Sequence, residues 1–216
     1  MHDIPTIPTK EEMQRALEAR HGKELQKRFT ESTVAICGLG GLGSHIAFAL
    51  ARAGVGKLIL IDFDRVDISN LHRQQYRAVQ IGQYKTEALK ENLQEIAPYT
   101  DMVTHTVRIT EENLTELLQD ADIICEAFDD AEEKAMLVNG VLEKLHRKYL
   151  IAASGMAGLG SANSIRTRKV MERFYLCGDG VSDVKDDIGL VAPRVMLCAA
   201  HQAQMVLRIL SGNYEP

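Results

Sequence analysis

Four charged side chains in this sequence are placed where they can act together: Asp62, Arg73, Lys85 and Asp129. The two aspartates each follow a short apolar run, and Arg73 lies in a polar stretch over 64–76. Lys85 falls in the first turn of an expected helix, where the helix dipole disfavours a cation. It therefore indicates a nearby anion, the alternative being a surface lysine tolerated at small cost. Such cations and carboxylates suit a triphosphate with a divalent metal ion.

A glycine-rich turn precedes these residues. The letters GLGGLGS, residues 38–44, separate an apolar run over 34–37, which predicts a strand, from an apolar-periodic segment over 42–53, which predicts a helix. The glycines of the turn are Gly38, Gly40, Gly41 and Gly43. We expect Gly38 to permit the tight turn, Gly40 to let a phosphate or ribose lie against the backbone, and Gly43 to let the helix pack closely.

Asp62 completes a nucleotide-binding pattern. A second strand is predicted over 58–61, and Asp62 follows it about 20 residues beyond the turn, where a carboxylate can bind ribose hydroxyls. Free N–H groups at the start of the helix 42–53 attract anionic oxygens. Together these parts predict one βαβ nucleotide-binding unit, the alternative being a glycine turn without a ligand.

The remaining chain continues the alternation of strands and helices. Further strands are expected over 102–107, 121–127, 149–153, 161–168 and 172–176, and helices over 10–29, 83–95, 110–118, 131–147 and 194–210. This order predicts an α/β, Rossmann-like fold with a mostly parallel sheet, helices on both faces, and C-terminal strands and a helix. Ligands of such sheets bind beyond the carboxyl ends of the strands, which gathers the polar residues at one edge.

Length and composition limit the possible functions. The 216 residues suit a single domain over 1–216, with an N-terminal helical arm over 1–30. A formal net charge of −5 argues against nucleic acid as the main partner. No apolar run is long enough for a membrane and the N-terminus has no signal pattern, so we expect a cytoplasmic protein without a membrane partner. The four cysteines form no CxxC pair, so no zinc is expected.

Two nucleotide-binding functions remain open on the residues alone. An NAD-dependent oxidoreductase would use the glycine turn and Asp62, but no side chain is an obvious acid–base group for hydride transfer. A triphosphate accounts for more of the polar residues. Arg73 and Lys85 can neutralise its phosphates, Asn70 can orient them, and Asp129 can hold Mg²⁺.

Four motifs in order resemble the family of E1-like adenylyltransferases, which includes ThiF, MoeB and HesA. These motifs are GLGGLGS, DFDRVDISNLHRQ, GQYKTEAL and Asp129 at a strand end. The resemblance is clearest from about Val34 to Ala153. The short chain and its ending look most like a ThiF-type protein of thiamine biosynthesis.

The resemblance implies a role for each matched residue. Asp62 matches the ribose-binding acid, and Lys85 matches a phosphate-binding lysine. Asp129 matches the acid that binds magnesium, with Asp64 as a weaker second ligand. The other matched positions are Gly40 and Gly41, which face the nucleotide, and Asn70, Arg73 and Gln74, which contact the phosphates.

The resemblance also implies the reaction and the partners. The substrate is a small ubiquitin-like sulfur-carrier protein ending in Gly-Gly, whose carboxylate attacks the α-phosphate of ATP. A sulfur donor protein later makes the thiocarboxylate. A homodimer is expected, and Arg20 is the candidate that reaches the phosphates of a second subunit. The alternatives are a molybdopterin-type carrier, another carboxylate on a small molecule or tRNA, and a nucleotide-binding scaffold without turnover.

Cysteine chemistry is where the sequence departs from this family. Many relatives carry two CxxC pairs that bind zinc, which this chain lacks. Many also have a cysteine on a loop that joins or carries the substrate. Only Cys177, which opens the expected loop over 177–190, falls in a place where exposure is plausible. The alternative is a structural thiol, so a part in sulfur transfer stays open.

Overall fold

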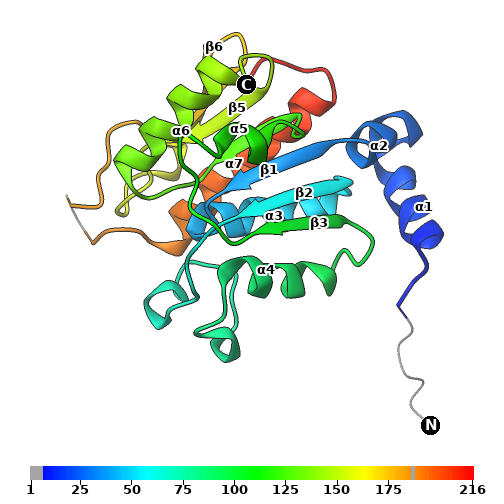
Figure 1. Cartoon of the computed structure of the whole chain (residues 1–216). Coiled ribbons are helices and arrows are strands. Elements are labelled where there is room, and N and C mark those ends of the chain that lie inside the picture. Colours follow the sequence, from blue (N-terminus) through cyan, green and yellow to red (C-terminus); the bar gives the residue numbers. More distant parts are fainter. Residues whose placement is uncertain (1–6, 186–187) are drawn as a thin grey trace.

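Seven strands form one sheet in the computed structural model, which describes residues 7–185 and 188–216. Their order across the sheet is β3-β2-β1-β4-β5-β7-β6 (Figure 1). The strands are β1 (Thr33–Cys37), β2 (Lys57–Ile61), β3 (Asp101–His105), β4 (Ile123–Glu126), β5 (Tyr149–Ala153), β6 (Arg166–Met171) and β7 (Phe174–Gly178). Neighbours are parallel except β6 and β7, which are antiparallel. The predicted α/β fold with a mostly parallel sheet is confirmed.

Helices cover both faces of this sheet. They are α1 (Lys10–His21), α2 (Lys23–Thr30), α3 (Gly41–Ala53), α4 (Lys85–Gln94), α5 (Leu114–Leu118), α6 (Ala131–Lys144) and α7 (Ala192–Leu210). On β1, Val34 and Ile36 pack into one core with α3, α4 and α7, whereas Ala35 and Cys37 pack into another with α5 and α6. Successive side chains of a strand point to opposite faces, so one apolar run fills both cores.

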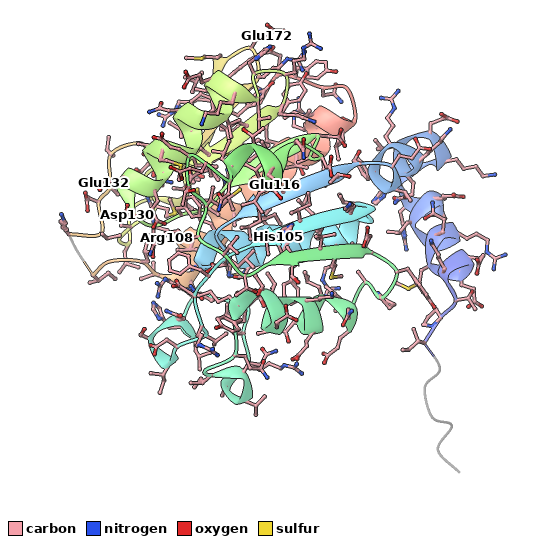
Figure 2. All side chains as sticks on the ribbon, in the orientation of Figure 1. His105, Arg108, Glu116, Asp130, Glu132 and Glu172 are labelled. Carbon is pink, nitrogen blue, oxygen red and sulfur yellow. The ribbon has the colours of Figure 1, made fainter. Side chains whose placement is uncertain are left out.

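The carboxyl ends of the parallel strands meet at one edge. In Figure 1 this edge lies at the left, where the described parts of the segment after β7 are drawn in orange, and α1 and α2 lie on the opposite side. Arg108, which follows β3, and Asp130, which precedes α6, are both labelled at this edge in Figure 2. No helix of the described residues combines the length and the apolar character that crossing a lipid bilayer requires.

The N-terminal arm is two helices where the sequence predicts one over 10–29. Thr9 and Glu12 form a capping box at the start of α1, as expected. The helix ends at Gly22, whose φ of 82° is a conformation that favours glycine, and α2 then starts in a new direction. The prediction of one continuous helix over 10–29 was therefore wrong, because Gly22 ends the first helix within an otherwise helical pattern.

Three other expected elements are displaced or shortened. The helix over 110–118 is regular only as α5, because the side chain of Asn113 accepts from the N–H of Thr110 and forms a turn there. The strand over 161–168 starts only at Arg166, after a 3₁₀ turn over 162–164. The strand expected over 172–176 is β7, which extends to Gly178 and so includes Cys177.

Candidate active site

A cleft of about 550 Å³ opens at the carboxyl edge of the sheet. Pockets for small molecules typically measure about 300–1,000 Å³. Ten of the predicted site residues line this cleft: Gly38, Gly40, Gly41, Asp62, Asp64, Asn70, Arg73, Gln74, Lys85 and Asp129. The remaining one, Gly43, lies inside α3. The structure thus brings residues from three loops together, while the ligand of each stays a prediction.

The glycine turn has the geometry that its sequence suggests. Gly38 has a φ of 90°, and its N–H donates to the carbonyl oxygen of Ile61 at 2.9 Å. A Cβ atom on Gly43 would lie 1.8 Å from the carbonyl oxygen of Gly38, so α3 approaches β1 this closely only without a side chain there. A Cβ atom on Gly40 would meet nothing nearer than Gln74 Nε2 at 3.6 Å. The backbone at Gly40 is therefore open to the cleft.

Asp62 is a buried carboxylate that connects two loops. Its Oδ2 accepts from the N–H of Leu39 at 2.7 Å, and its Oδ1 accepts from the N–H of Asp64 at 2.7 Å. Burial raises the pKa of Asp62, and Lys85 and these two hydrogen bonds oppose the rise. Each carboxylate oxygen has a second lone pair, so Asp62 can also accept from ribose hydroxyls.

Lys85 lies between two carboxylates of the chain. Its Nζ donates to Asp64 Oδ2 at 2.8 Å and lies 3.9 Å from Asp62 Oδ2. Lys85 is buried although it opens α4, where the helix dipole disfavours a cation. The nearby anion that the sequence indicates is therefore present within the chain. Lys85 still lines the cleft, so a phosphate can share it with Asp64.

Arg73 and Gln74 carry unsatisfied polar atoms at the cleft. The Nε of Arg73 and the Oε1 of Gln74 are buried and have no hydrogen-bond partner among the described residues. One Nη of Arg73 donates to the carbonyl oxygen of Ser69 at 3.2 Å, which holds the guanidinium beside the loop. Asn70 caps the same short turn, because its Oδ1 accepts from the N–H of Asp67 at 3.2 Å. Buried polar groups usually have partners, and both residues line the cleft, so a bound ligand or water can supply them.

Asp129 and Asp130 have different surroundings. Asp130 is the N-cap of α6, since its Oδ1 accepts from the N–H groups of Glu132 and Glu133 at 2.9 Å each. Asp130 and Glu132 are labelled at the start of this helix in Figure 2. Asp129 is exposed, lines the cleft, and makes no side-chain hydrogen bond within the described residues. Of these two aspartates, Asp129 is thus the one whose carboxylate is available to a ligand.

The carboxylates of Asp129 and Asp64 suit a metal ion that is held in part by the phosphates of a bound substrate. Asp129 and Asp64 both line the cleft, although Lys85 already neutralises Asp64. Within residues 7–185 and 188–216, no group of three or more His, Cys, Asp or Glu side chains could hold a metal. Mg²⁺ usually binds one or two carboxylates together with substrate phosphates, so this donor set suits it.

The cleft wall also contains an ion pair that the sequence did not predict, because its partners lie on different elements. Glu126 ends β4 and is fully buried, and its Oε2 accepts from Lys134 Nζ at 2.6 Å. Lys134 lines the cleft and also donates to the carbonyl oxygen of Ala153 at 2.9 Å. Burial raises the pKa of Glu126, and Lys134 opposes the rise. A carboxylate at the end of an apolar strand was the available signal, since a buried charge needs a partner.

A family model matches most of this chain. The model described as the ThiF family matches residues 13–216. The chain belongs to the ThiF family. The resemblance of its four motifs is confirmed.

Three curated relatives show how this ThiF-family chain compares in length. It is 32% identical over 205 residues to adenylyltransferase and sulfurtransferase MOCS3 of Aedes aegypti, covering 89% of this chain and 45% of the relative. It is 35% identical over 150 residues to sulfur carrier protein adenylyltransferase of Thermus thermophilus, covering 67% and 55%. It is 29% identical over 195 residues to adenylyltransferase and sulfurtransferase UBA4 of Lodderomyces elongisporus, covering 88% and 42%. The chain thus spans about half the length of the curated relatives it matches.

Solved structures share the fold of this ThiF-family chain. The E. coli tRNA N6-threonylcarbamoyladenosine dehydratase TcdA, in complex with ATP, matches with a TM-score of 0.83, covering 96% of this chain and 98% of TcdA. At 18% identity this likeness shows the fold alone. E. coli MccB, in a structure with AMPCPP and MccA, matches with a TM-score of 0.70 at 25% identity, covering 89% and 60%.

Cys177 is not exposed, which corrects the expectation from its sequence. It lies at the end of β7, fully buried, and its Sγ is 3.5 Å from Thr167 Oγ1. Burial raises its pKa to about 11, with Thr167 and Arg168 opposing. The expectation was wrong because Cys177 continues the register of β7 beside Ala153 of β5. Cysteines buried in this way are usually structural, so the position of Cys177 favours the structural thiol.

Arg20 does not contact the cleft of its own chain. It is exposed and belongs to α1. This helix lies on the side of the molecule opposite the carboxyl edge of the sheet (Figure 1). That position is compatible with contact to a second subunit, and its role stays a prediction.

Proposed function

We propose that this chain uses Mg-ATP to adenylate the C-terminal carboxylate of a small ubiquitin-like sulfur-carrier protein ending in Gly-Gly. The observation that carries the proposal is one cleft that combines an open glycine backbone, the buried acid Asp62, the cations Arg73 and Lys85, and the free carboxylate of Asp129. Membership of the ThiF family and a relative named sulfur carrier protein adenylyltransferase support it. The shared fold with ATP-bound and AMP-bound TcdA supports the choice of nucleotide.

The chemistry requires positioning and charge neutralisation. An oxygen of the carrier's terminal carboxylate forms a bond to the α-phosphorus of ATP, and the bond from that phosphorus to the bridging oxygen of the β-phosphate breaks. The products are the acyl-adenylate and pyrophosphate. No general base is needed, because a terminal carboxylate is ionised at neutral pH. The rate then depends on the alignment of the reacting atoms and on stabilising the charge that develops on pyrophosphate.

Each site residue has a part in this arrangement. Asp62 accepts from the ribose hydroxyls, while the open backbone at Gly40 lets the phosphates approach the start of α3. Arg73 and Lys85 neutralise the phosphate oxygens, and the orphaned Nε of Arg73 gains an acceptor. Asp129, with Asp64 as a weaker second ligand, would hold Mg²⁺, which supplies positive charge to the phosphates when it is bound.

A thiamine-type carrier is our first choice of substrate, and a molybdopterin-type carrier is the second. The first follows the ThiF family to which the chain belongs. The names of the relatives, which combine adenylyltransferase with sulfurtransferase, keep the second open. A homodimer and a separate sulfur donor belong to the same proposal, with Arg20 as the residue offered to the partner's phosphates. Cys177 is left out of it, because its thiol is buried.

ATP–pyrophosphate exchange tests the proposal. The purified chain is assayed with Mg²⁺ and either a thiamine-type or a molybdopterin-type carrier, and each carrier is matched by a form that lacks its last glycine. Exchange that requires the intact carrier supports adenylation and identifies the partner. Absence of exchange with both carriers contradicts it. Binding of ATP and NAD, measured by calorimetry on the same preparation, then separates another carboxylate substrate from an oxidoreductase.

A further inference from the structure

A second buried ion pair lies outside the predicted nucleotide-binding residues. Arg194 Nη2 lies 2.5 Å from Asp179 Oδ2, and the two side chains are only 6% and 7% exposed. Arg194 is in the first turn of α7, where the helix dipole disfavours a cation. A charge in such a place persists only with well-placed partners, so the pair is a strong constraint on the backbone around it.

This ion pair joins three segments that are far apart in the sequence. One Nη of Arg194 donates to the carbonyl oxygens of Gly160 and Ser161 at 2.6 and 2.8 Å, which fixes the loop after β5. On the other side, Asp179 Oδ1 accepts from the N–H groups of Val181 and Ser182 at 2.9 Å each, which fixes the segment after β7. Since Arg194 belongs to α7, one guanidinium holds both loops against this helix.

Both loops form a wall of the cleft. Residues 153–157 and 182–184 line it, and the N–H of Ala157 donates to Ser182 Oγ at 3.1 Å, which links the two stretches. A shallower groove of about 380 Å³, lined by 157–160, 179 and 181–183 with Arg194, adjoins the cleft and shares Ala157, Ser182 and Asp183 with it. The stretches 153–157 and 182–184 together are called the β5–β7 wall below.

The β5–β7 wall is separate from the residues assigned to ATP. Those residues come from the loops after β1, β2 and β4 and from the start of α4. The acceptor carboxylate must reach the α-phosphate from a part of the cleft that the nucleotide leaves free. The β5–β7 wall carries no residue assigned to the nucleotide, and the groove adjoins the cleft on this side, so it is the side on which an extended chain end can lie.

We propose that the Arg194–Asp179 pair is a positioning device for the acceptor, which holds the β5–β7 wall where the incoming carboxylate is aligned with the α-phosphate. This inference rests on the proposed adenylation. Both residues line the groove, but the inference requires no contact with a substrate, because they act by holding Ser182, Ala157 and their neighbours in place. Loss of the pair therefore weakens use of the acceptor and leaves ATP binding nearly intact.

Arg194→Met tests this positioning role, because methionine keeps much of the buried volume and removes the charge. Asp179→Asn is the second variant, to be used if Arg194→Met folds poorly. Its amide oxygen can still accept from the N–H groups of the loop. Lys169→Met is the matched control, since it removes the exposed Lys169–Glu215 ion pair on β6. Arg194→Lys restores the charge without the planar fork of donors.

Three measurements are made on each variant: ATP affinity by calorimetry, pyrophosphate exchange against carrier concentration, and amide hydrogen exchange of residues 179–184. In Arg194→Met we expect kcat/KM for the carrier to fall by about tenfold to 100-fold, as for a small misplacement of reacting groups. We expect ATP affinity within about twofold of wild type, partial recovery in Arg194→Lys, and no effect in Lys169→Met. The amides of Val181 and Ser182 should exchange faster.

Two results would overturn the inference. One is unchanged kcat/KM for the carrier in a folded variant that has lost the pair. The other is a loss of ATP affinity that matches the loss of activity, which would make the pair a general support of the fold. If the wild-type chain itself shows no exchange with either carrier, the proposed adenylation fails. The positioning role then fails with it, and faster hydrogen exchange confined to 179–184 would show only that the pair orders the wall. When the wild-type chain does show pyrophosphate exchange, a variant with unchanged use of the carrier refutes the inference alone.

Discussion

Replacing Lys85 by methionine should destabilise the protein in a pH-dependent way. The Nζ of Lys85 lies 3.9 Å from Oδ2 of Asp62, and both side chains are less than a tenth exposed. At an effective dielectric constant of about 20, this separation corresponds to an attraction of about 4 kcal/mol. The closer contact to Asp64 adds at most about 1 kcal/mol, because that carboxylate is half exposed and regains water.

Asp62 keeps other partners in this variant, which limits the loss. Its two oxygens still accept from the N–H groups of Leu39 and Asp64, and each such hydrogen bond to a charged group contributes about 1.5–3 kcal/mol. Methionine also preserves the packing of the buried lysine stem. We therefore expect Lys85→Met to lower the free energy of unfolding by about 2–4 kcal/mol at neutral pH.

The pH dependence follows from the carboxylate left behind. Burial already raises the pKa of Asp62, and removal of Lys85 takes away the main opposing effect. A carboxyl group whose pKa is higher in the folded state destabilises the fold at pH values above its unfolded pKa, and this penalty disappears as it is protonated. The deficit of Lys85→Met relative to wild type should therefore shrink as the pH falls through the raised pKa of Asp62 toward the ordinary pKa of an aspartate.

Urea unfolding at several pH values measures this deficit, with Lys90→Met as the matched control. Lys90 is on the same helix and has no ion pair among the described residues, so its replacement changes the net charge equally. We expect the control to stay within about 0.5 kcal/mol of wild type, as for a surface substitution. A deficit for Lys85→Met that stays constant or grows toward acidic pH would refute the reasoning, because it would show that Asp62 is not the group left unpaired.

The remaining predictions concern the cleft and its glycine turn. Arg73→Ala should raise the activation barrier for pyrophosphate exchange by on the order of 2–4 kcal/mol, as for one preorganised charge contact, and an unchanged kcat/KM contradicts its assignment. Asp129→Ala should abolish Mg²⁺-dependent exchange with little change in melting temperature, whereas Asp130→Ala should lower the free energy of unfolding by about 0.5–2 kcal/mol through the lost helix cap. If Asp130→Ala instead abolished Mg²⁺-dependent exchange and Asp129→Ala lowered the free energy of unfolding, the roles assigned to the two aspartates would be wrong. Gly43→Ala should destabilise the fold by about 1–3 kcal/mol or prevent folding, because its Cβ meets the carbonyl oxygen of Gly38, and a wild-type melting curve would contradict that contact.

Local rules in the sequence predicted the framework of the site well. The run over 34–37 and the glycines after it determine β1, its turn and the start of α3 through steric requirements that act within a few residues. The positions of Asp62 and Asp129 at strand ends follow from the parallel topology, so their presence in one cleft was predictable. These features depend on backbone geometry and hydrophobic periodicity, which a sequence displays directly.

Contacts between distant elements were the part that the sequence could not supply. Glu126 and Lys134 meet because β4 and α6 pack in one particular orientation, and Arg194 meets Asp179 across two loops. No local preference encodes either pair. Cys177 was misplaced for the same reason, since its burial depends on the pairing of β7 with β5.

The two hydrogen bonds of Asp62 have a consequence for the thermodynamics of ligand recognition. One carboxylate fastens the turn after β1 to the loop after β2, so the two loops are already in place when the chain has folded. Their conformational entropy is lost during folding, and little remains to be lost when a nucleotide arrives. This preorganisation favours affinity without requiring further contacts. It also means that a substitution of Asp62 alters scaffold and ligand site together, so weakened binding in such a variant does not by itself identify a ribose contact.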